Sequence, residues 1–446
     1  MSNLPQELYN EIFKGTDNSN LLSCSLVCKA WLPSTRQSPL FQNISMTNSN
    51  ADAFADLVMN SNSSFPFCIQ ELTLDVNATW LRRLLPFLQS SNIQSLRISN
   101  IDWSKIDEHT QSQFISYFPT TVQKLAIGPA VAFEDLVGAT RLINQFSSLK
   151  ALSMKDVQWS RVRAKIDSNS RHSTVHNKTL QSNPNYTTFP FYPLPADCRS
   201  LHFTQCDLSD LSDWLHAHKP FPNVPKLHLE DAKLPELTHL RAIYINASPV
   251  VEELWLSFDV TAGPIGDFNC AIEVVYERES RGKDLVPRLR IPKQVMERVK
   301  GYCPEDRINY FLPSLVKLRF DNFVYFSSKD RSCGVFYALH ALTFLACRKN
   351  CTPLRQVICG IMLHRAGDLD RHVIDWPLLD IALLQLADFA RVGGEEYRVD
   401  GSETGFRIIF EIGGGANVEA VTALIQVKLP QSHIESIVEF KEVTVG

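Results

Sequence analysis

A short unit of two large apolar residues separated by one position recurs along most of the chain. In Leu72-Thr73-Leu74 this alternation is typical of a β-strand with one buried face. Leu72 and Leu96 begin successive units 24 residues apart, and Leu227 and Leu254 begin successive units 27 residues apart. We therefore predict a repeat structure with one strand in each unit. Further copies lie at Leu96–Ile98, Leu125–Ile127, Leu152–Met154, Leu201–Phe203, Leu227–Leu229, Leu254–Leu256 and Leu318–Phe320, with a weaker one at Val357–Cys359.

Helical patterns precede several of these strands. Leu81, Leu84, Leu85 and Leu88 follow the spacing i, i+3, i+4, i+7 of one helix face. We therefore predict an α/β fold, a curved solenoid of leucine-rich-repeat type with parallel strands inside and helices outside. An ordinary α/β domain shows the same local alternation, but the near-constant period favours the repeat. Similar patterns precede the strands at Leu125 and Leu152, formed by Phe114, Tyr117 and Phe118 and by Leu142 and Phe146.

Two intervals between strands are longer than one repeat. The residues Ser160–Asn185 are rich in Ser, Asn and basic side chains, a composition typical of a loop. We therefore expect irregular repeats over residues 66–365, with insertions near 160–195 and 261–312. The pattern changes beyond Cys359, where an apolar helix from Trp376, a strand near residues 406–412 and a helix from Ala416 predict a C-terminal cap over residues 366–446.

The N-terminus has a different pattern. Leu4, Leu8 and Ile12 predict an amphipathic helix that begins near Asn3, a good N-cap. The second apolar segment, from Leu21 to Trp31, is too apolar for a helix with only one buried face. A segment of about forty residues rarely buries this much apolar surface by itself, so it needs a partner. The alternative is that it only covers the end of the repeat array.

The same residues resemble a known family. Leu4-Pro5-Gln6-Glu7-Leu8, Ile12-Phe13, the run from Leu21 to Trp31 and Leu40-Phe41 look like an F-box. The resemblance implies a three-helix module over residues 1–45 that binds a Skp-type adaptor and, through it, a cullin-RING ubiquitin ligase. Residues 46–65 would form a linker and first helix. On this resemblance the adaptor-binding residues are Leu4, Pro5, Leu8, Ile12, Leu22, Val27, Cys28 and Trp31.

F-box proteins with leucine-rich repeats are a common arrangement, so one resemblance covers both parts of the chain. The repeats depart from that pattern because they lack a regular Asn at the turn. In such a solenoid, the strand residues that alternate with the buried ones line the concave face. Trp255 is an anchor of the kind that dominates protein interfaces. The alternative is that the Lys and Arg residues on these strands are only the solvated side of the sheet. The predicted target-binding residues are Arg97, Lys155, His202, His228, Trp255, Lys317 and Arg319.

Composition narrows the range of partners. The net charge of −4 gives no basic field for a phosphate backbone, so we do not expect nucleic acid as a partner. No secretory signal and no apolar run long enough to span a membrane is present, so we expect a cytoplasmic or nuclear protein without a membrane partner. The eleven cysteines are then reduced thiols.

No catalytic or metal-binding motif emerges, so we expect a non-enzymatic protein without cofactor or metal. The predicted function is target recognition in a Skp-cullin-F-box type ubiquitin ligase. The alternative is a leucine-rich-repeat scaffold or regulator that has no link to ubiquitination.

Overall fold

The computed structural model of the chain describes residues 6–14, 42–59, 69–89, 91–118, 120–159, 192–206, 224–232, 250–258, 273–278, 285–290, 314–325, 354–371, 374–394, 406–430 and 437–443, with a few single residues between them.

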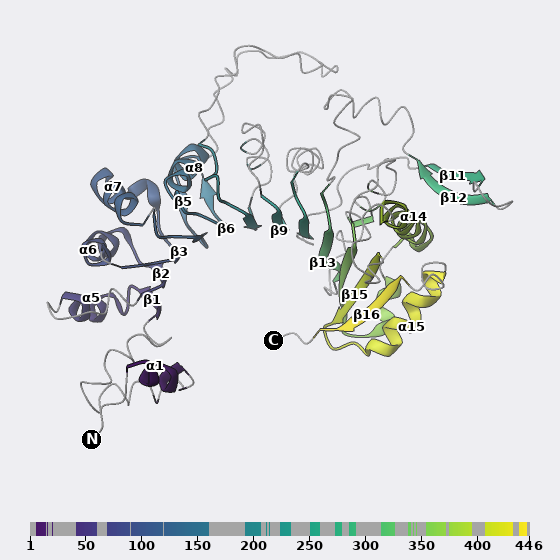
Figure 1. Cartoon of the computed structure of the whole chain (residues 1–446), viewed down its shortest axis with the longest axis horizontal. Coiled ribbons are helices and arrows are strands. Elements are labelled where there is room, and N and C mark those ends of the chain that lie inside the picture. The colour runs from purple at the N-terminus through teal and green to yellow at the C-terminus, as the bar shows by residue number, and fades with distance from the viewer. Residues whose placement is uncertain are drawn as a thin grey trace, which may run out of the picture. The chain divides into compact units, whose positions relative to one another are not determined.

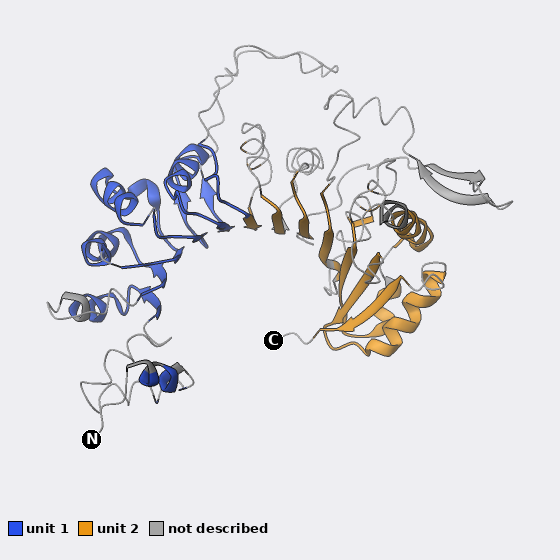
Figure 2. Cartoon of the chain, viewed as in Figure 1, with its two compact units in different colours: residues 1–173, 187–199 blue, residues 174–186, 200–446 orange. Residues whose placement is uncertain are grey.

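The chain divides into two compact units (Figure 2). Unit 1 comprises residues 1–173 and 187–199, and unit 2 comprises residues 174–186 and 200–446. The described elements of unit 1 are α1 (Gln6–Lys14), β1 (Asn43–Thr47), α5 (Ala51–Met59), β2 (Glu71–Asp75), α6 (Ala78–Leu88), β3 (Ser95–Ile98), η2 (Trp103–Lys105), α7 (Glu108–Tyr117), β4 (Lys124–Ile127), β5 (Ala132–Phe133), α8 (Leu136–Asn144), β6 (Ala151–Lys155) and β7 (Gln158–Trp159) (Figure 1).

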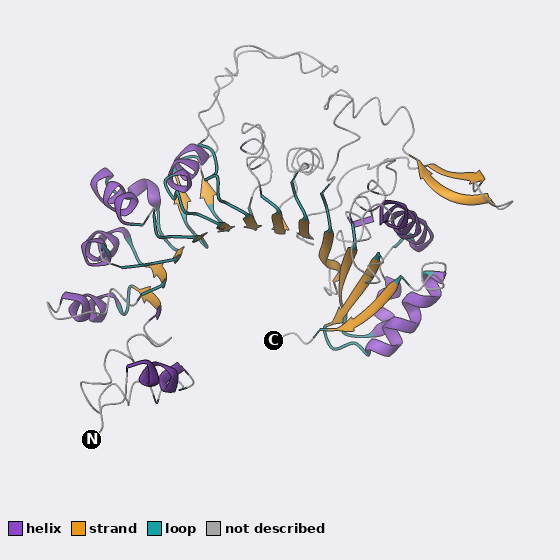
Figure 3. Cartoon of the chain, viewed as in Figure 1, coloured by secondary structure: helices purple, strands orange, loops and turns teal. Residues whose placement is uncertain are grey.

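Strands β1, β2, β3, β4 and β6 of unit 1 pair in this order, and every pairing is parallel. The register places the first apolar residue of each strand motif beside that of the next strand, so Leu72, Leu96, Leu125 and Leu152 form one buried row. Helices α5, α6, α7 and α8 lie on one side of these strands (Figure 3). Because parallel strands need long crossover connections, the helices supply both the connection and the cover for the buried row.

Helix α6 shows how the sequence sets this packing. Asn77 caps its N-terminus by accepting a hydrogen bond from the Trp80 backbone N–H at 3.1 Å. The four leucines predicted to share one face, Leu81, Leu84, Leu85 and Leu88, are all buried. The predicted helix and its core face are therefore confirmed.

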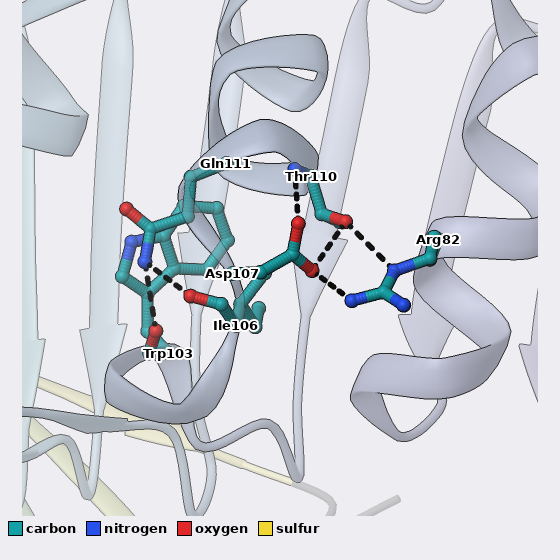
Figure 4. A network of polar contacts seen from close by, with 6 residues as sticks. All are labelled: Arg82, Trp103, Ile106, Asp107, Thr110 and Gln111. Atoms are coloured by element: carbon teal, nitrogen blue, oxygen red, sulfur yellow. Dashed lines mark hydrogen bonds and ion pairs between the residues drawn. The ribbon is translucent and has the colours of Figure 1, made fainter.

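A network of polar contacts joins α6 to α7 (Figure 4). Asp107 is the N-cap of α7, and its carboxylate accepts hydrogen bonds from the Thr110 N–H at 3.0 Å and the Thr110 hydroxyl at 2.8 Å. The guanidinium of Arg82 on α6 forms an ion pair with the same carboxylate. The Arg82 hydrogen bond is the largest effect on the pKa of Asp107 and lowers it well below its usual range. One side chain thus both starts a helix and links it to the preceding repeat.

The chain turns sharply after the strands of unit 1. Asn100, Ala130 and Asp156 adopt positive φ angles of 54°, 55° and 46° just beyond β3, β4 and β6. These turns lead to a second row of short parallel pairs, β5 with β7 and Asp102 with Ala132. The turns therefore repeat even though the sequence shows no regular turn residue.

Unit 2 contains a second run of parallel strands. The described elements are β8 (Ser200–Thr204), β9 (Lys226–Ala232), β10 (Glu253–Phe258), β11 (Glu273–Arg278), β12 (Leu285–Arg290), β13 (Lys317–Tyr325), β14 (Gln356–Met362), η3 (Ala366–Arg371), α14 (Trp376–Gly394), β15 (Arg407–Gly413), α15 (Val418–Lys428) and β16 (Val438–Glu442). The parallel order is β8, β9, β10, β13, β14, β15 and β16, whereas β11 and β12 form a separate antiparallel pair.

The β13–β14 pair contains a bulge that bears on the site described below. Phe320 pairs with Cys359 and Val324 with Ile361, so three residues of β13 lie opposite the single residue Gly360. A Cβ atom on Gly360 would lie 2.2 Å from the carbonyl oxygen of Asp321. Glycine is therefore what allows the two backbones to approach this closely.

Several elements differ from the sequence expectations. Sequence reasoning missed β1, although Ile44-Ser45-Met46 has the same alternation as the other strands and lies 28 residues before Leu72. The strand predicted near residues 406–412 is confirmed as β15, whereas β16, which continues the parallel pairing beyond it, was not predicted. The β11–β12 hairpin lies in the expected insertion near residues 261–312, and most of the insertion near residues 160–195 lies outside the described residues.

Candidate functional site

Helix α1 presents apolar side chains to solvent. The relative exposure is 49% for Leu8 and 55% for Ile12, whereas Phe13 is buried. The helix ends near Thr16, whose hydroxyl donates a hydrogen bond to the Ile12 carbonyl at 3.0 Å. Leucine and isoleucine side chains normally gain about 1.5–3 kcal/mol each from full burial, so their exposure four residues apart on one helix makes this helix face a candidate interaction surface. The other predicted adaptor-binding residues, Leu4, Pro5, Leu22, Val27, Cys28 and Trp31, lie outside the described residues.

A second candidate surface lies on the polar face of the unit 2 strands. The register pairs His202 with His228, His228 with Trp255, and Trp255 with Arg319. These four residues therefore form one continuous row across β8, β9, β10 and β13. Lys317 lies two residues before Arg319 and shares its face of the sheet. The structure thus brings together five of the seven predicted target-binding residues.

The row is a stack of rings. The His202 and His228 rings meet edge to face with their centroids 5.4 Å apart. The His228 and Trp255 rings stack with centroids 4.2 Å apart and an interplanar angle of 9°. Because neighbouring parallel strands hold these side chains about 4.8 Å apart, the ring geometry follows directly from the strand register.

Two cations from β13 lie over the Trp255 ring. The Lys317 ammonium nitrogen is 5.4 Å from the ring centroid and the Arg319 guanidinium carbon is 4.9 Å from it. The indole is therefore held between its neighbours and is half-buried. Trp255 is predicted from the sequence to be an exposed anchor, and in the structure its ring is in contact with His228 and with these cations. Cation–π attraction of this kind favours the observed positions of both cations.

Carboxylates surround Arg319 more closely than sequence analysis anticipated. Its guanidinium forms ion pairs with Asp321 and with Glu411, the latter at 2.7 Å. Burial lowers the pKa of Arg319, but hydrogen bonds to these two carboxylates outweigh that effect and leave the pKa above its ordinary value. Asp321 is the first residue of the β13 bulge that lies opposite Gly360.

The opposite corner of the surface is acidic. A carboxylate oxygen of Glu230 lies 3.0 Å from the His202 imidazole and accepts a hydrogen bond from the Thr204 hydroxyl at 3.0 Å. Glu230 was missed by sequence analysis, although it lies two residues after His228 and alternation alone places it on the same face. No local signal could have found Glu411, because its approach to Arg319 depends on strand pairing across a long stretch of sequence.

The centre of the row is poorly solvated. The Nε2 atom of His228 and the Nε1 atom of Trp255 are buried and have no hydrogen-bond partner among the described residues. Burial is the main cause that lowers the pKa of His228 to about 4, and the neighbouring His202 adds to this effect. His228 is therefore neutral at neutral pH. The two remaining predicted residues, Arg97 and Lys155, lie in unit 1, where both are exposed.

These features define an α/β protein built on parallel strands, with a helix near its N-terminus that exposes two apolar side chains and a polar surface lined with aromatic and charged residues. None of the helices in the described part of the chain combines the length and the apolar character needed to cross a lipid bilayer.

Comparison with known proteins identifies the N-terminal segment. Residues 1–41 match the family model of the F-box domain. This match includes α1 and the exposed residues Leu8 and Ile12. No curated protein matches the chain.

Proposed function

We propose that this chain is a target-recognition subunit of a Skp-cullin-F-box type ubiquitin ligase. Its F-box domain binds a Skp-type adaptor, and the strands that follow present a surface for a target protein. The observation that carries the proposal is that the F-box match includes a helix with two large apolar side chains exposed on its surface.

Docking explains why these side chains are exposed. Covering Leu8 and Ile12 with a partner protein removes apolar surface from water, at about 25 cal/mol for each Å² buried. Phe13, on the same helix, is already buried and anchors α1 to its own chain. The helix thus has one side for packing and another for a partner.

The parallel strands support a leucine-rich-repeat type of architecture for the remainder. In each strand motif, the first and third residues of the apolar-polar-apolar pattern are buried, as Leu72 and Leu74 or Leu227 and Leu229 illustrate. The intervening residues are left on the opposite face of the sheet, where they are free to contact a partner. The proposed target-binding residues are His202, His228, Trp255, Lys317 and Arg319 in unit 2 and Arg97 and Lys155 in unit 1.

The role is that of a binding protein, since recognition needs only these two surfaces and the ubiquitin-transfer chemistry belongs to other subunits. A protein in this role works in the cytoplasm or the nucleus, where such ligases assemble. The alternative, a repeat scaffold outside the ubiquitin system, predicts no adaptor binding.

Co-purification of the full-length chain with a Skp-type adaptor tests the proposal. We expect the Leu8→Glu, Ile12→Glu double variant to lose the adaptor, because each charge would have to be desolvated in an apolar interface. Val427→Glu is the matched control, since Val427 is a more exposed apolar residue, at 79%, on helix α15 of unit 2, outside the residues of the F-box match. Adaptor binding that is absent in the wild type, or equal in all three proteins, contradicts the proposal.

A further inference from the structure

Most charges on the polar face of unit 2 are locally matched. Lys226 forms an ion pair with Glu253 at 3.1 Å, and Arg407 forms one with Glu439 at 2.6 Å. Arg319 is held by two carboxylates. These ion pairs leave little uncompensated charge that a partner could recognise.

Lys317 is different from its neighbours. The register places it directly beside Glu253, but Glu253 is paired with Lys226 instead. The Lys317 ammonium lies over the Trp255 ring, and no carboxylate of the described residues lies within ion-pair distance of it. A half-buried ammonium with three donors therefore lies against an aromatic ring and has no paired carboxylate among the residues that the structure describes.

Glu230 is the opposite case. Its contacts are the Thr204 hydroxyl and the His202 ring, which is charged only when protonated. His228, the nearest ring in the same strand, is kept neutral by burial. At neutral pH this carboxylate has hydrogen-bond partners, but no Lys or Arg of the described residues forms an ion pair with it.

The two unmatched charges lie at opposite corners of the aromatic row. Glu230 is on β9 and Lys317 is on β13, with β10 between them, and their positions differ by four residues along the strand direction. From standard strand spacings their Cα atoms lie about 16 Å apart, with His228 and Trp255 between them. The surface therefore has a positive corner, an aromatic centre and a negative corner.

The charges around these corners reinforce this polarity. Among the described residues, the row at the start of the strands carries Lys226, Lys317 and Arg407 against the single acid Glu253. The row at the strand ends carries Glu230, Asp321 and Glu411 against the single base Lys441, which lies beside Glu411 on β16. A ligand with charge of only one sign would be attracted at one end and repelled at the other. An acidic group and a basic group in the same ligand would satisfy both ends.

We propose that this face of unit 2 binds an extended polypeptide segment of a target protein, which places an acidic group on Lys317 and a basic side chain on Glu230 across the His228–Trp255 pair. The proposal rests on the proposed function only in that the segment belongs to the recognised target. In an extended segment the two charges are about four to six residues apart, because each residue spans about 3.3 Å. The acidic group is a carboxylate or a phosphate, since either accepts hydrogen bonds from an ammonium group.

A displayed library of random peptides, selected on the immobilised full-length protein, tests this inference. We expect the selected peptides to carry an acidic and a basic residue about four to six positions apart, with apolar residues between them. We expect the Lys317→Glu variant of the protein to bind a selected peptide about tenfold or more weakly than the wild type does. Replacing the acidic residue of that peptide with Lys should restore binding to the variant. Glu230→Lys behaves in the same way toward the basic residue. Serine and phosphoserine placed at the acidic position distinguish a phosphate from a carboxylate requirement.

Lys441→Glu is the control, because Lys441 is an exposed cation on β16, three strands away from Lys317. We expect it to bind the selected peptides as the wild type does. Lys317→Gln removes the charge without adding an acid and replaces Lys317→Glu if that variant does not fold. Peptides without the charge pair, no enrichment at all, or unchanged binding by the Lys317 variants overturns the inference. Capture of a Skp-type adaptor by the same proteins is a separate measurement. If the wild type does not capture the adaptor, the proposed function is refuted, but the inference about peptide binding is not.

Discussion

The imidazole of His228 lies parallel to the indole of Trp255, and each ring has a buried nitrogen without a hydrogen-bond partner among the described residues. Stacking of aromatic rings contributes about 0.5–1.5 kcal/mol, whereas a buried unpaired donor costs about 1–3 kcal/mol. The two effects oppose one another. The pair is therefore not explained by stability alone, which is consistent with the proposed binding role of this surface.

Replacing Trp255 with Phe removes the unpaired N–H and keeps an aromatic ring between His228 and the cations. We expect the free energy of unfolding to change by less than about 1 kcal/mol, because the removed desolvation cost offsets the lost contact area. Trp255→Ala, which removes the whole ring, should be clearly less stable than Trp255→Phe. Chemical denaturation of the three proteins measures this difference, and a Phe variant as unstable as the Ala variant would contradict the interpretation.

Protonation of His228 should destabilise the fold. Its pKa is lowered from the ordinary value of 6.5 to about 4, so the unfolded chain takes up this proton before the folded chain does. The stability contributed by neutral His228 is therefore present above pH 6.5 and is lost as the pH falls from 6.5 to about 4. Thermal unfolding at a series of pH values should show a shallower loss for His228→Asn than for the wild type. Parallel curves over this window would rule out the assigned role.

Gly360 should tolerate no side chain. A Cβ atom there would lie 2.2 Å from the Asp321 carbonyl oxygen, within the bulge that supports the Arg319 ion pairs. We expect Gly360→Ala to cost about 1–3 kcal/mol, as overpacking usually does. Gly367→Ala is the matched control, because a Cβ atom at Gly367 meets nothing within 4 Å. Equal stability of the two variants in urea would show that the strands separate without cost.

Asp107 should stabilise unit 1 through both of its contacts. Asn at this position can still cap α7 but cannot pair with Arg82, and Ala can do neither. We therefore expect the melting temperature to fall in the order wild type, Asp107→Asn, Asp107→Ala.

The pH dependence separates the ion pair from the cap. The pKa of Asp107 is lowered in the folded protein, so its contribution is present above the unfolded pKa of about 3.9 and is lost as the pH falls below it. Below this pH the wild type and Asp107→Asn should converge in melting temperature. A difference that persists under acid conditions would assign the effect to packing rather than to charge.

Much of the secondary structure could be predicted from local pattern. The alternation around Leu72 or Leu227 and the four-leucine face of α6 are determined by residues adjacent in sequence, and the structure confirms these elements. Strand β1 was overlooked because it directly follows the F-box, even though Ile44 and Met46 carry the same signal. The left-handed turns at Ala130 and Asp156 have no such signal, since neither residue type requires that conformation.

The sequence by itself determined which residues face inward and which face outward, because that choice depends on the alternation within each strand. It also determined the F-box match, which depends on a contiguous stretch of residues. Only the tertiary structure decided which charges are neutralised. From the sequence, Arg319 is an unpaired cation, but strand pairing brings Glu411 to it across some ninety residues. The same pairing leaves Lys317 without a carboxylate partner in the described part of the chain. Charge balance on a parallel sheet depends on register between distant segments, and composition and local pattern do not contain that information.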